Sequence, residues 1–253
     1  MKIDLEGKTA LVTGGTGELG RVMVQTLAEC GANVIVHFLH NEAKAEQLVR
    51  EIEQFGVRGN AVQGDVTSAE SVRQMARKVE REIGSPDIIV ANAVVQIHPW
   101  QSVLDEDFED YESQFKSCVM QSVYLAKAFI PSMIERGWGR YIAINTECAM
   151  EAAANSSAYV TGKRGLDGLV RTLAKEVGKH QVTVNQIAPG WTISDRYRAE
   201  PTNDEAYVAT VPLNRRGTDQ EIANVVAFIA SDLSSYITGA YIPVCGGRIM
   251  PGI

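Results

Sequence analysis

Residues 9–20 read Thr9-Ala10-Leu11-Val12-Thr13-Gly14-Gly15-Thr16-Gly17-Glu18-Leu19-Gly20, a short apolar run that leads directly into a glycine-rich turn. An amphipathic stretch at 21–30 follows, so the order is strand, turn and helix. Glycines let the backbone approach a pyrophosphate closely, and the amides and dipole at a helix N-terminus attract its charge. The stretch therefore predicts a dinucleotide-binding site, although a tight turn whose glycines serve only packing would look the same.

The same alternation continues along the whole chain. Strand-like apolar runs lie at 9–13, 33–38, 60–63, 88–91, 141–145, 182–187 and 240–244, and helical patterns lie at 21–30, 42–55, 68–83, 115–136, 158–177 and 219–231. Apolar strands that alternate with helices form a buried parallel sheet with helices on both faces. We therefore expect an α/β fold, a doubly wound, seven-stranded parallel sheet of the Rossmann type, as a single domain over 1–253. The irregular stretch at about 191–218 is expected to be a lid.

The composition argues against several classes of function. The 253 residues carry a net charge of -7 and a pI near 5.2, which argues against nucleic acid or an anionic membrane as a partner. No apolar run approaches the ~18–20 residues of a membrane span. The N-terminus lacks an apolar signal segment, so a cytoplasmic location is expected. The cysteines are too scattered for a ligand set, so we expect free thiols and no metal; they are Cys30, Cys118, Cys148 and Cys245.

Tyr159 and Lys163 are the strongest candidates for catalysis. They stand about one helical turn apart, so the phenol and the ammonium share a face of the predicted helix. A tyrosine hydroxyl ordinarily titrates near pH ~10, and a neighbouring cation favours the phenolate. Such a pair could act as a general acid or base on a carbonyl or an alcohol. The spacing alone is weak, because it also occurs by chance in many helices.

The end of the second strand bears on the choice of cofactor and reads Val36-His37-Phe38-Leu39-His40-Asn41. An acidic residue there would bind the ribose 2′-hydroxyl of NAD, whereas a basic one would accommodate the 2′-phosphate of NADP. The run has no carboxylate and no Arg or Lys, so NADP(H) is favoured weakly over NAD(H), on His37, His40 and Asn41. Histidines in such positions are often uninvolved.

These motifs, in this order, resemble the short-chain dehydrogenase/reductase family, in its single-domain branch of enzymes such as the 3-oxoacyl-[acyl-carrier-protein] reductases. The resemblance covers essentially the whole chain. Its markers are the glycine turn, Asp65-Val66, Asn92-Ala93, Tyr159 with Lys163, Pro189-Gly190, Pro212-Leu213-Asn214-Arg215, Glu221-Ile222-Ala223, Tyr236-Ile237-Thr238-Gly239 and Gly246-Gly247.

The resemblance implies a role for each matching residue. Tyr159 would exchange a proton with a carbonyl or alcohol oxygen, and Lys163 would bind the nicotinamide ribose and lower the tyrosine pKa. Thr146 stands where the family has its active-site serine, and Cys118 where it has an asparagine whose carbonyl holds a water. The expected cofactor contacts are Gly14, Thr16, Gly17, Glu18, Leu19, Gly20, Phe38, His40, Asp65, Val66, Asn92, Ala93, Tyr159, Lys163, Pro189, Gly190, Thr192 and Ser194. The implied activity is that of an NADP(H)-dependent carbonyl reductase or alcohol dehydrogenase acting on a small molecule.

Departures from the family's pattern cluster at this site. Val94 replaces a glycine beside the expected nicotinamide ribose, and Cys118 replaces the asparagine. Glu147 and Cys148 follow Thr146 where small or apolar residues are common, and Cys245 stands where an aspartate often precedes the two glycines. In addition, Glu18 brings a carboxylate near the pyrophosphate. They motivate an alternative, a catalytically weak or silent binding or regulatory protein with the same fold. Retention of Tyr159, Lys163 and a hydroxyl at Thr146 favours the enzyme.

The resemblance also implies a homotetramer, or a homodimer. One interface would lie on the helices at about 106–135 and 157–178, and another on the last strand and the tail at 248–253. Candidates by position for the walls of the substrate pocket are Gln96, His98, Trp100, Glu151, Asn155, Trp191 and Tyr197. Docking of a carrier protein would require a basic patch beside the pocket, to which Arg136, Arg140, Lys179 and His180 could contribute.

Overall fold

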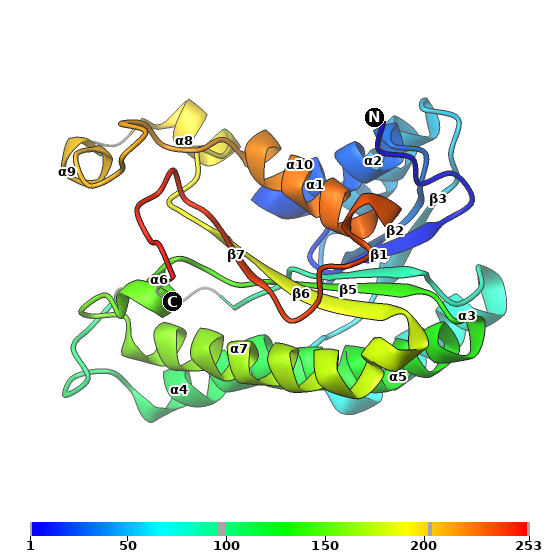
Figure 1. Ribbon diagram of the computed structural model, residues 1–253, viewed down its shortest axis with the longest axis horizontal. Coiled ribbons are helices and arrows are strands. Elements are labelled where there is room, and N and C mark those ends of the chain that lie inside the picture. Colours follow the sequence, from blue (N-terminus) through cyan, green and yellow to red (C-terminus); the bar gives the residue numbers. More distant parts are fainter. Residues whose placement is uncertain (1, 96–99, 202–203, 252–253) are drawn as a thin grey trace.

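The strands form one sheet in which every neighbouring pair is parallel (Figure 1). Their order is β3-β2-β1-β4-β5-β6-β7. Their bounds are β1 (Thr9–Val12), β2 (Asn33–Phe38), β3 (Gly59–Gln63), β4 (Ile88–Ala91), β5 (Gly139–Ile144), β6 (Val182–Pro189) and β7 (Tyr241–Val244). The computed structural model describes residues 2–95, 100–201 and 204–251, and within them the predicted doubly wound, seven-stranded α/β fold is confirmed.

Helices form two layers, one on each face of the sheet (Figure 1). One layer contains α1 (Glu18–Glu29), α2 (Glu42–Glu53) and α10 (Asp219–Ala230), and the other contains α3 (Ala69–Glu82), α4 (Phe108–Gln114), α5 (Gln121–Arg136) and α7 (Ser157–Val177). Short elements lie in the connections, namely η1 (Phe115–Met120), α6 (Cys148–Glu151), η2 (Gly178–His180), α8 (Asp195–Ala199), α9 (Glu205–Val208) and η3 (Asp232–Ser234). In the part of the chain that the structure describes, no helix is both long and apolar enough to cross a bilayer.

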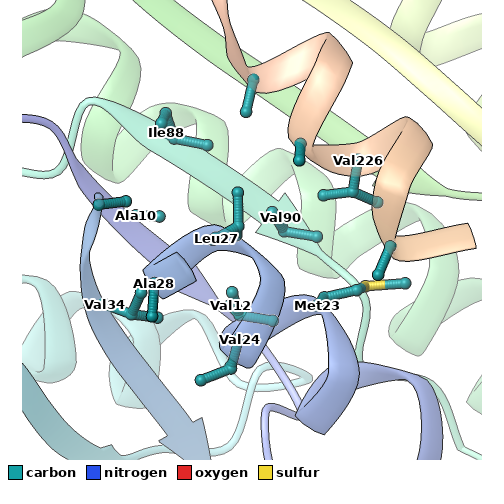
Figure 2. Packing of buried hydrophobic residues seen from close by; sticks show 14 of the residues in the cluster. Ala10, Val12, Met23, Val24, Leu27, Ala28, Val34, Ile88, Val90 and Val226 are labelled. Atoms are coloured by element: carbon teal, nitrogen blue, oxygen red, sulfur yellow. The ribbon is translucent and has the colours of Figure 1, made fainter. Parts of the chain in front are cut away.

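The strands are mostly apolar because helices cover both faces of the sheet. Side chains alternate between the two faces along each strand. Val12 and Val90 therefore pack with the α1 and α10 layer, whereas Leu11 packs with the other layer. Figure 2 shows Leu27 of α1 and Val226 of α10 lying over these two valines. Burial on both sides explains why the strand segments show no alternation of apolar and polar residues.

One helix differs from its prediction. The apolar pattern predicted a helix at 115–136, but helical structure begins with α4 and passes through the π-helical turn η1 before α5. The first turn of α4 carries Glu109 and Asp110, whose charges suit the helix dipole but give no apolar period to detect. The π-helical turn contains Cys118, and such turns are frequent at functional sites.

The strand order places a crevice at one edge of the sheet. The chain runs outward from β1 through β2 to β3, then returns to β4 on the other side of β1. At such a reversal the loops diverge, and open α/β sheets bind ligands beyond the carboxyl ends of the strands there. The segments that follow β1, β4, β5 and β6 meet at this edge, at 13–17, 92–95, 145–147 and 190–194.

Candidate active site

The turn after β1 is held by residues that follow β4. The Thr13 hydroxyl accepts hydrogen bonds from the Asn92 and Ala93 amides at 2.9 and 3.0 Å. The Asn92 side-chain amide donates in return to the Thr13 carbonyl at 2.9 Å. The two residues expected to contact the cofactor after β4 thus brace the glycine turn itself.

The glycine turn has the geometry of an anion site. Gly14 adopts φ +61°, and a Cβ on Gly20 would lie 2.1 Å from the Gly14 carbonyl oxygen, so both positions require glycine. Gly17 is the N-cap of α1 and brings no side-chain cap, which leaves the first helical amides to a ligand. The pyrophosphate of a dinucleotide fits this arrangement.

The adenosine end of the crevice differs from the expectation. His37 is only 2% exposed and Asn41 caps α2 by accepting from the Lys44 amide at 3.0 Å, so neither is free for a 2′-phosphate. Among the three groups invoked for NADP, only His40 is exposed and without such a commitment. Phe38 and Val66, at the ends of this region, are buried.

A basic pocket that the sequence analysis missed lies beside the glycine turn. Its lining includes Thr16 of the turn, Arg21 of α1 and Lys44 of α2. Glu51 lies on its wall and accepts hydrogen bonds from two glutamine amides. Lys44 lies in the first turn of α2, beyond the end of β2 on which the expectation for NADP(H) rested.

Tyr159, Thr146 and Lys163 are brought together at the end of β5. The Tyr159 hydroxyl hydrogen-bonds to the Thr146 side chain. Lys163 is 3% exposed, donates from Nζ to the Ile144 carbonyl at 2.7 Å, and places Nζ 5.8 Å from the centre of the Tyr159 ring. The Tyr241 hydroxyl donates to the Thr146 carbonyl at 2.7 Å and so fixes the loop that carries this hydroxyl.

Burial has the largest effect on the pKa values of Tyr159 and Lys163. It raises the pKa of Tyr159 well above its ordinary value, and the hydrogen bond to Thr146 opposes it only in part. Burial also lowers the pKa of Lys163. The Lys163 ammonium donates to the Ile144 carbonyl, and a lowering of the Tyr159 pKa by Lys163 stays a prediction. Tyr159 is therefore neutral and able to donate a proton.

Cys118 lies in the π-helical turn and is 1% exposed. Its thiol is 3.8 Å from Gln114 Oε1. The π-helical turn that carries Cys118, the position that aligns with the family's asparagine, packs against α7, the helix of Tyr159 and Lys163.

A second cluster, centred on Glu147, lies behind Thr146, and its contacts could not be predicted from the sequence. Glu147 is 2% exposed, accepts from the Tyr207 hydroxyl at 2.8 Å and stands 3.2 Å from Arg248. Burial raises the pKa of this carboxyl. Arg248 also binds Glu151 through both terminal nitrogens and donates to the Thr210 hydroxyl at 2.8 Å. These contacts join the C-terminal segment to α6 and to the 191–218 segment.

The 191–218 segment contacts the start of α1, directly after the glycine turn. The Glu18 carboxylate accepts from the Arg196 amide at 3.1 Å, and Arg21 pairs with Asp195 at 2.5 Å. Glu18 thus contacts this segment, which gives its carboxylate a role besides the expected cofactor contact. Thr192 bonds to the Gly190 carbonyl at 2.9 Å, and Ser194 is buried at the start of α8.

Aromatic residues line two sides of the site. Trp100 is 43% exposed and its ring lies 5.9 Å from that of Tyr159. Trp191 donates from Nε1 to the Tyr197 hydroxyl at 2.7 Å, and Arg216 lies 4.2 Å from the ring centres of both. The other proposed wall residues, Gln96 and His98, lie outside the described residues.

His37 leads to a prediction about stability. Burial lowers its pKa from 6.5 to about 4, so the folded state binds fewer protons than the unfolded state between these values. The free energy of unfolding should therefore fall as the pH falls, by about 2 kcal/mol between pH 7 and pH 5 from this group. Urea unfolding at both pH values tests this, with His37→Gln as the variant without a titrating group. Equal pH dependence in the two proteins would contradict the prediction.

The fold and the arrangement at its edge define a class, the dinucleotide-dependent oxidoreductases of the Rossmann type with a tyrosine–lysine pair. Within that class, the chain belongs to the short-chain dehydrogenase/reductase family. Residues 16–248 match a family model described as enoyl-(acyl carrier protein) reductase. As a member, the protein is an NAD(P)-dependent oxidoreductase.

Individual relatives match the chain along nearly its whole length. A 3-oxoacyl-[acyl-carrier-protein] reductase of Pseudomonas aeruginosa is 35% identical over 251 residues, which cover 98% of this chain and 100% of the relative. An L-rhamnose 1-dehydrogenase (NAD(P)(+)) of a Sphingomonas species is 31% identical and covers 96% of each chain. The solved structure of a blue fluorescent protein from a metagenomic library, in complex with NADPH, superposes with a TM-score of 0.90 at 31% identity, covering 98% and 100% of the two chains.

Proposed function

We propose that this protein interconverts a carbonyl group and a secondary alcohol on a free small molecule, with NADP(H) as the preferred cofactor. The observation that carries the proposal is the Tyr159 hydroxyl, held neutral by burial and hydrogen-bonded to Thr146, with Lys163 beside it. All three groups lie at the carboxyl edge of the sheet, where the glycine turn fits a pyrophosphate.

The residues divide the work of the reaction. When bound, the nicotinamide supplies the hydride that reduces the carbonyl carbon. Thr146 donates a hydrogen bond that holds and polarises the substrate oxygen, and Tyr159 gives that oxygen its proton. Lys163 donates one N–H to the Ile144 carbonyl, so its other two N–H groups can donate to the hydroxyls of the nicotinamide ribose. In the oxidative direction Tyr159 receives the proton from the alcohol.

Cofactor binding and turnover test this proposal separately. We expect NADPH to quench the tryptophan fluorescence of the protein. We also expect turnover of at least one compound in a panel of ketones, sugars and secondary alcohols, measured as a change in the absorbance of the reduced nicotinamide at 340 nm. No binding of NADPH or NADH at millimolar concentration would refute the enzyme. Tight binding without turnover on the whole panel would favour the alternative of a silent binding or regulatory protein.

The charge beside the site favours a free substrate over a carrier-bound one. The loop and helix near the crevice carry an acidic run, Asp105, Glu106, Asp107, Glu109, Asp110 and Glu112. The basic residues expected for docking lie elsewhere, because Arg140 and Lys179 stand at the amino ends of β5 and β6. Arg140 is also buried and paired with Asp232. An acidic carrier protein would meet like charge at the mouth of this pocket.

The basic pocket beside Thr16 supports the proposed preference for NADP(H). Lys44→Ala should raise the Kd for NADPH about tenfold, because one charged contact to a phosphate is lost, and leave the Kd for NADH unchanged. Fluorescence titration at low salt measures both constants. Lys175→Ala, an exposed lysine on α7, is the control for the loss of one charge. If Lys44→Ala raised the Kd for NADPH and the Kd for NADH by the same factor, Lys44 would not be the residue that distinguishes the two dinucleotides.

The homotetramer and the cytoplasmic location remain predictions. Exposed apolar side chains on and near α4 support the assembly, since they lie on one of the helices named for an interface. They are Val103, Leu104, Phe108 and Phe115.

A further inference from the structure

His37 is a buried histidine at the second-last position of β2, and the reaction as described makes no use of it. Its ring lies between two loops. The Gly14 amide donates to Nδ1 at 3.0 Å, and Nε2 lies 2.9 Å from the Gly64 carbonyl oxygen. Because a backbone amide can only donate, Nδ1 must be the unprotonated nitrogen and Nε2 must carry the hydrogen. The imidazole is therefore a neutral bridge with one acceptor and one donor, both used.

The two bridged loops belong to opposite ends of the adenosine half of the site. Gly14 opens the glycine turn, whose helix amides fit the pyrophosphate. Gly64 immediately precedes Asp65, the residue expected beside the adenine. The backbone of His37 reinforces the bridge, because its carbonyl accepts from the Gly15 amide at 2.9 Å. Two consecutive amides of the turn are thus tied to one residue of β2.

Close packing leaves the bridge little freedom. A Cβ on Gly14 would lie 3.1 Å from the Ala93 Cα, so the turn is pressed against the residues after β4. A Cβ on Gly64 would lie 3.6 Å from His37 Nε2 and 3.2 Å from the Met75 sulfur, so the second loop is enclosed as well. Replacing the imidazole by an apolar side chain would leave a buried amide and a buried carbonyl without partners. The turn would have to move to satisfy them.

We propose that His37 is the positioning residue that sets the distance between the pyrophosphate turn and the adenine loop, and so determines the affinity for the adenosine half of the dinucleotide. The inference rests on the proposed function only in that the protein binds NADP(H). His37 contacts neither the substrate nor the reacting atoms. Its loss should therefore weaken dinucleotide binding and spare chemistry at saturating cofactor.

A graded set of variants tests the bridge. His37→Asn keeps an acceptor for the Gly14 amide, His37→Gln keeps a donor for the Gly64 carbonyl, and His37→Leu keeps neither. We expect the Kd for NADPH to rise at least about tenfold in the leucine variant and by less in the other two. The Kd for 2′-phospho-ADP-ribose, which lacks the nicotinamide, should rise by the same factor. In every variant, kcat at saturating NADPH and KM for the carbonyl substrate should stay within about threefold of wild type.

Tyr141→Phe is the matched control, since it deletes one buried hydrogen bond, to the Ser122 carbonyl at 3.2 Å, in the opposite layer. It should lower stability without changing the Kd for NADPH. Unchanged NADPH affinity in the leucine variant would overturn the inference. A fall in kcat at saturating NADPH that grows with the loss of melting temperature across the variants would overturn it as well. If wild type itself binds neither NADPH nor the fragment, the proposed function fails instead.

Discussion

Tyr159→Phe should lower kcat for carbonyl reduction about a thousandfold and leave the Kd for NADPH within a factor of about two, because the phenol contributes a proton and little binding. The ring keeps its packing against Trp100, so the change removes one oxygen and its hydrogen bond to Thr146. General acid catalysis by a positioned side chain contributes roughly 10²–10⁴-fold. Among the described hydroxyl groups, that of Thr146 is the hydrogen-bond partner of the Tyr159 oxygen. Stopped-flow or steady-state rates at saturating NADPH measure the loss.

Tyr111→Phe is the control for this experiment. Its hydroxyl lies 2.6 Å from the Ser157 hydroxyl at the start of α7, so it also deletes a paired phenol near the same helix. We expect its kcat to stay close to wild type. A Tyr159→Phe protein that keeps a tenth or more of the wild-type kcat would show that another group supplies the proton. In that case the part played by Cys118, which lies beside the pair, would have to be reconsidered.

Arg248→Leu should destabilise the protein by about 2–4 kcal/mol, because it leaves the carboxyl of Glu147 buried beside the active-site loop without its cation. The Arg248 side chain is 15% exposed, and Glu147 Oε2 has no hydrogen-bond partner among the described residues. The nearby Trp191 amide does not satisfy this oxygen, because it donates its hydrogen bond to the Tyr207 hydroxyl at 2.8 Å. The loss is smaller than for a fixed charge, since burial already raises the pKa of Glu147 and lets it become neutral.

The double variant Arg248→Leu/Glu147→Gln isolates the buried pair. It should recover part of the stability, since no charge is then left unpaired. Arg215→Leu is the control, because Arg215 binds Glu221 through both terminal nitrogens on the surface, and we expect a much smaller fall in melting temperature there. Urea unfolding followed by circular dichroism compares the three proteins. Equal effects of Arg248→Leu and Arg215→Leu would show that burial of Glu147 carries no cost.

Removal of Arg248 should also weaken the binding of the substrate. Arg248 joins Glu151 of α6 to the 191–218 segment, through the Thr210 hydroxyl and the ring of Tyr207, whose centre is 5.0 Å from the guanidinium. A looser 191–218 segment would raise KM more than it lowers kcat, provided that this segment closes over the substrate as expected.

The periodicity of the sequence was sufficient for the fold. Seven apolar runs separated by amphipathic stretches allow few arrangements other than a parallel sheet between two layers of helices, and the glycine turn marks where its first helix begins. The apolar pattern alone placed the start of this helical region at residue 115, because α4 is acidic and lacks an apolar period, whereas the resemblance implied a helix from about residue 106. The candidate acid–base group was also visible, because Tyr159 and Lys163 lie one helical turn apart and a hydroxyl at Thr146 precedes them at the family's spacing.

Contacts between distant segments could not be read in this way. His37 looked like a surface group that might serve a phosphate, yet the fold buries it between Gly14 and Gly64. Lys44 and Arg21 converge on Thr16 only because α1 and α2 pack side by side, and Glu147 meets Arg248 across about a hundred residues of chain. By itself, the sequence determined the sheet, the glycine turn and the tyrosine–lysine pair, since local periodicity and spacing encode them. Only the tertiary structure decided which charges and hydroxyls are buried and paired, because burial and pKa depend on neighbours that are remote in sequence.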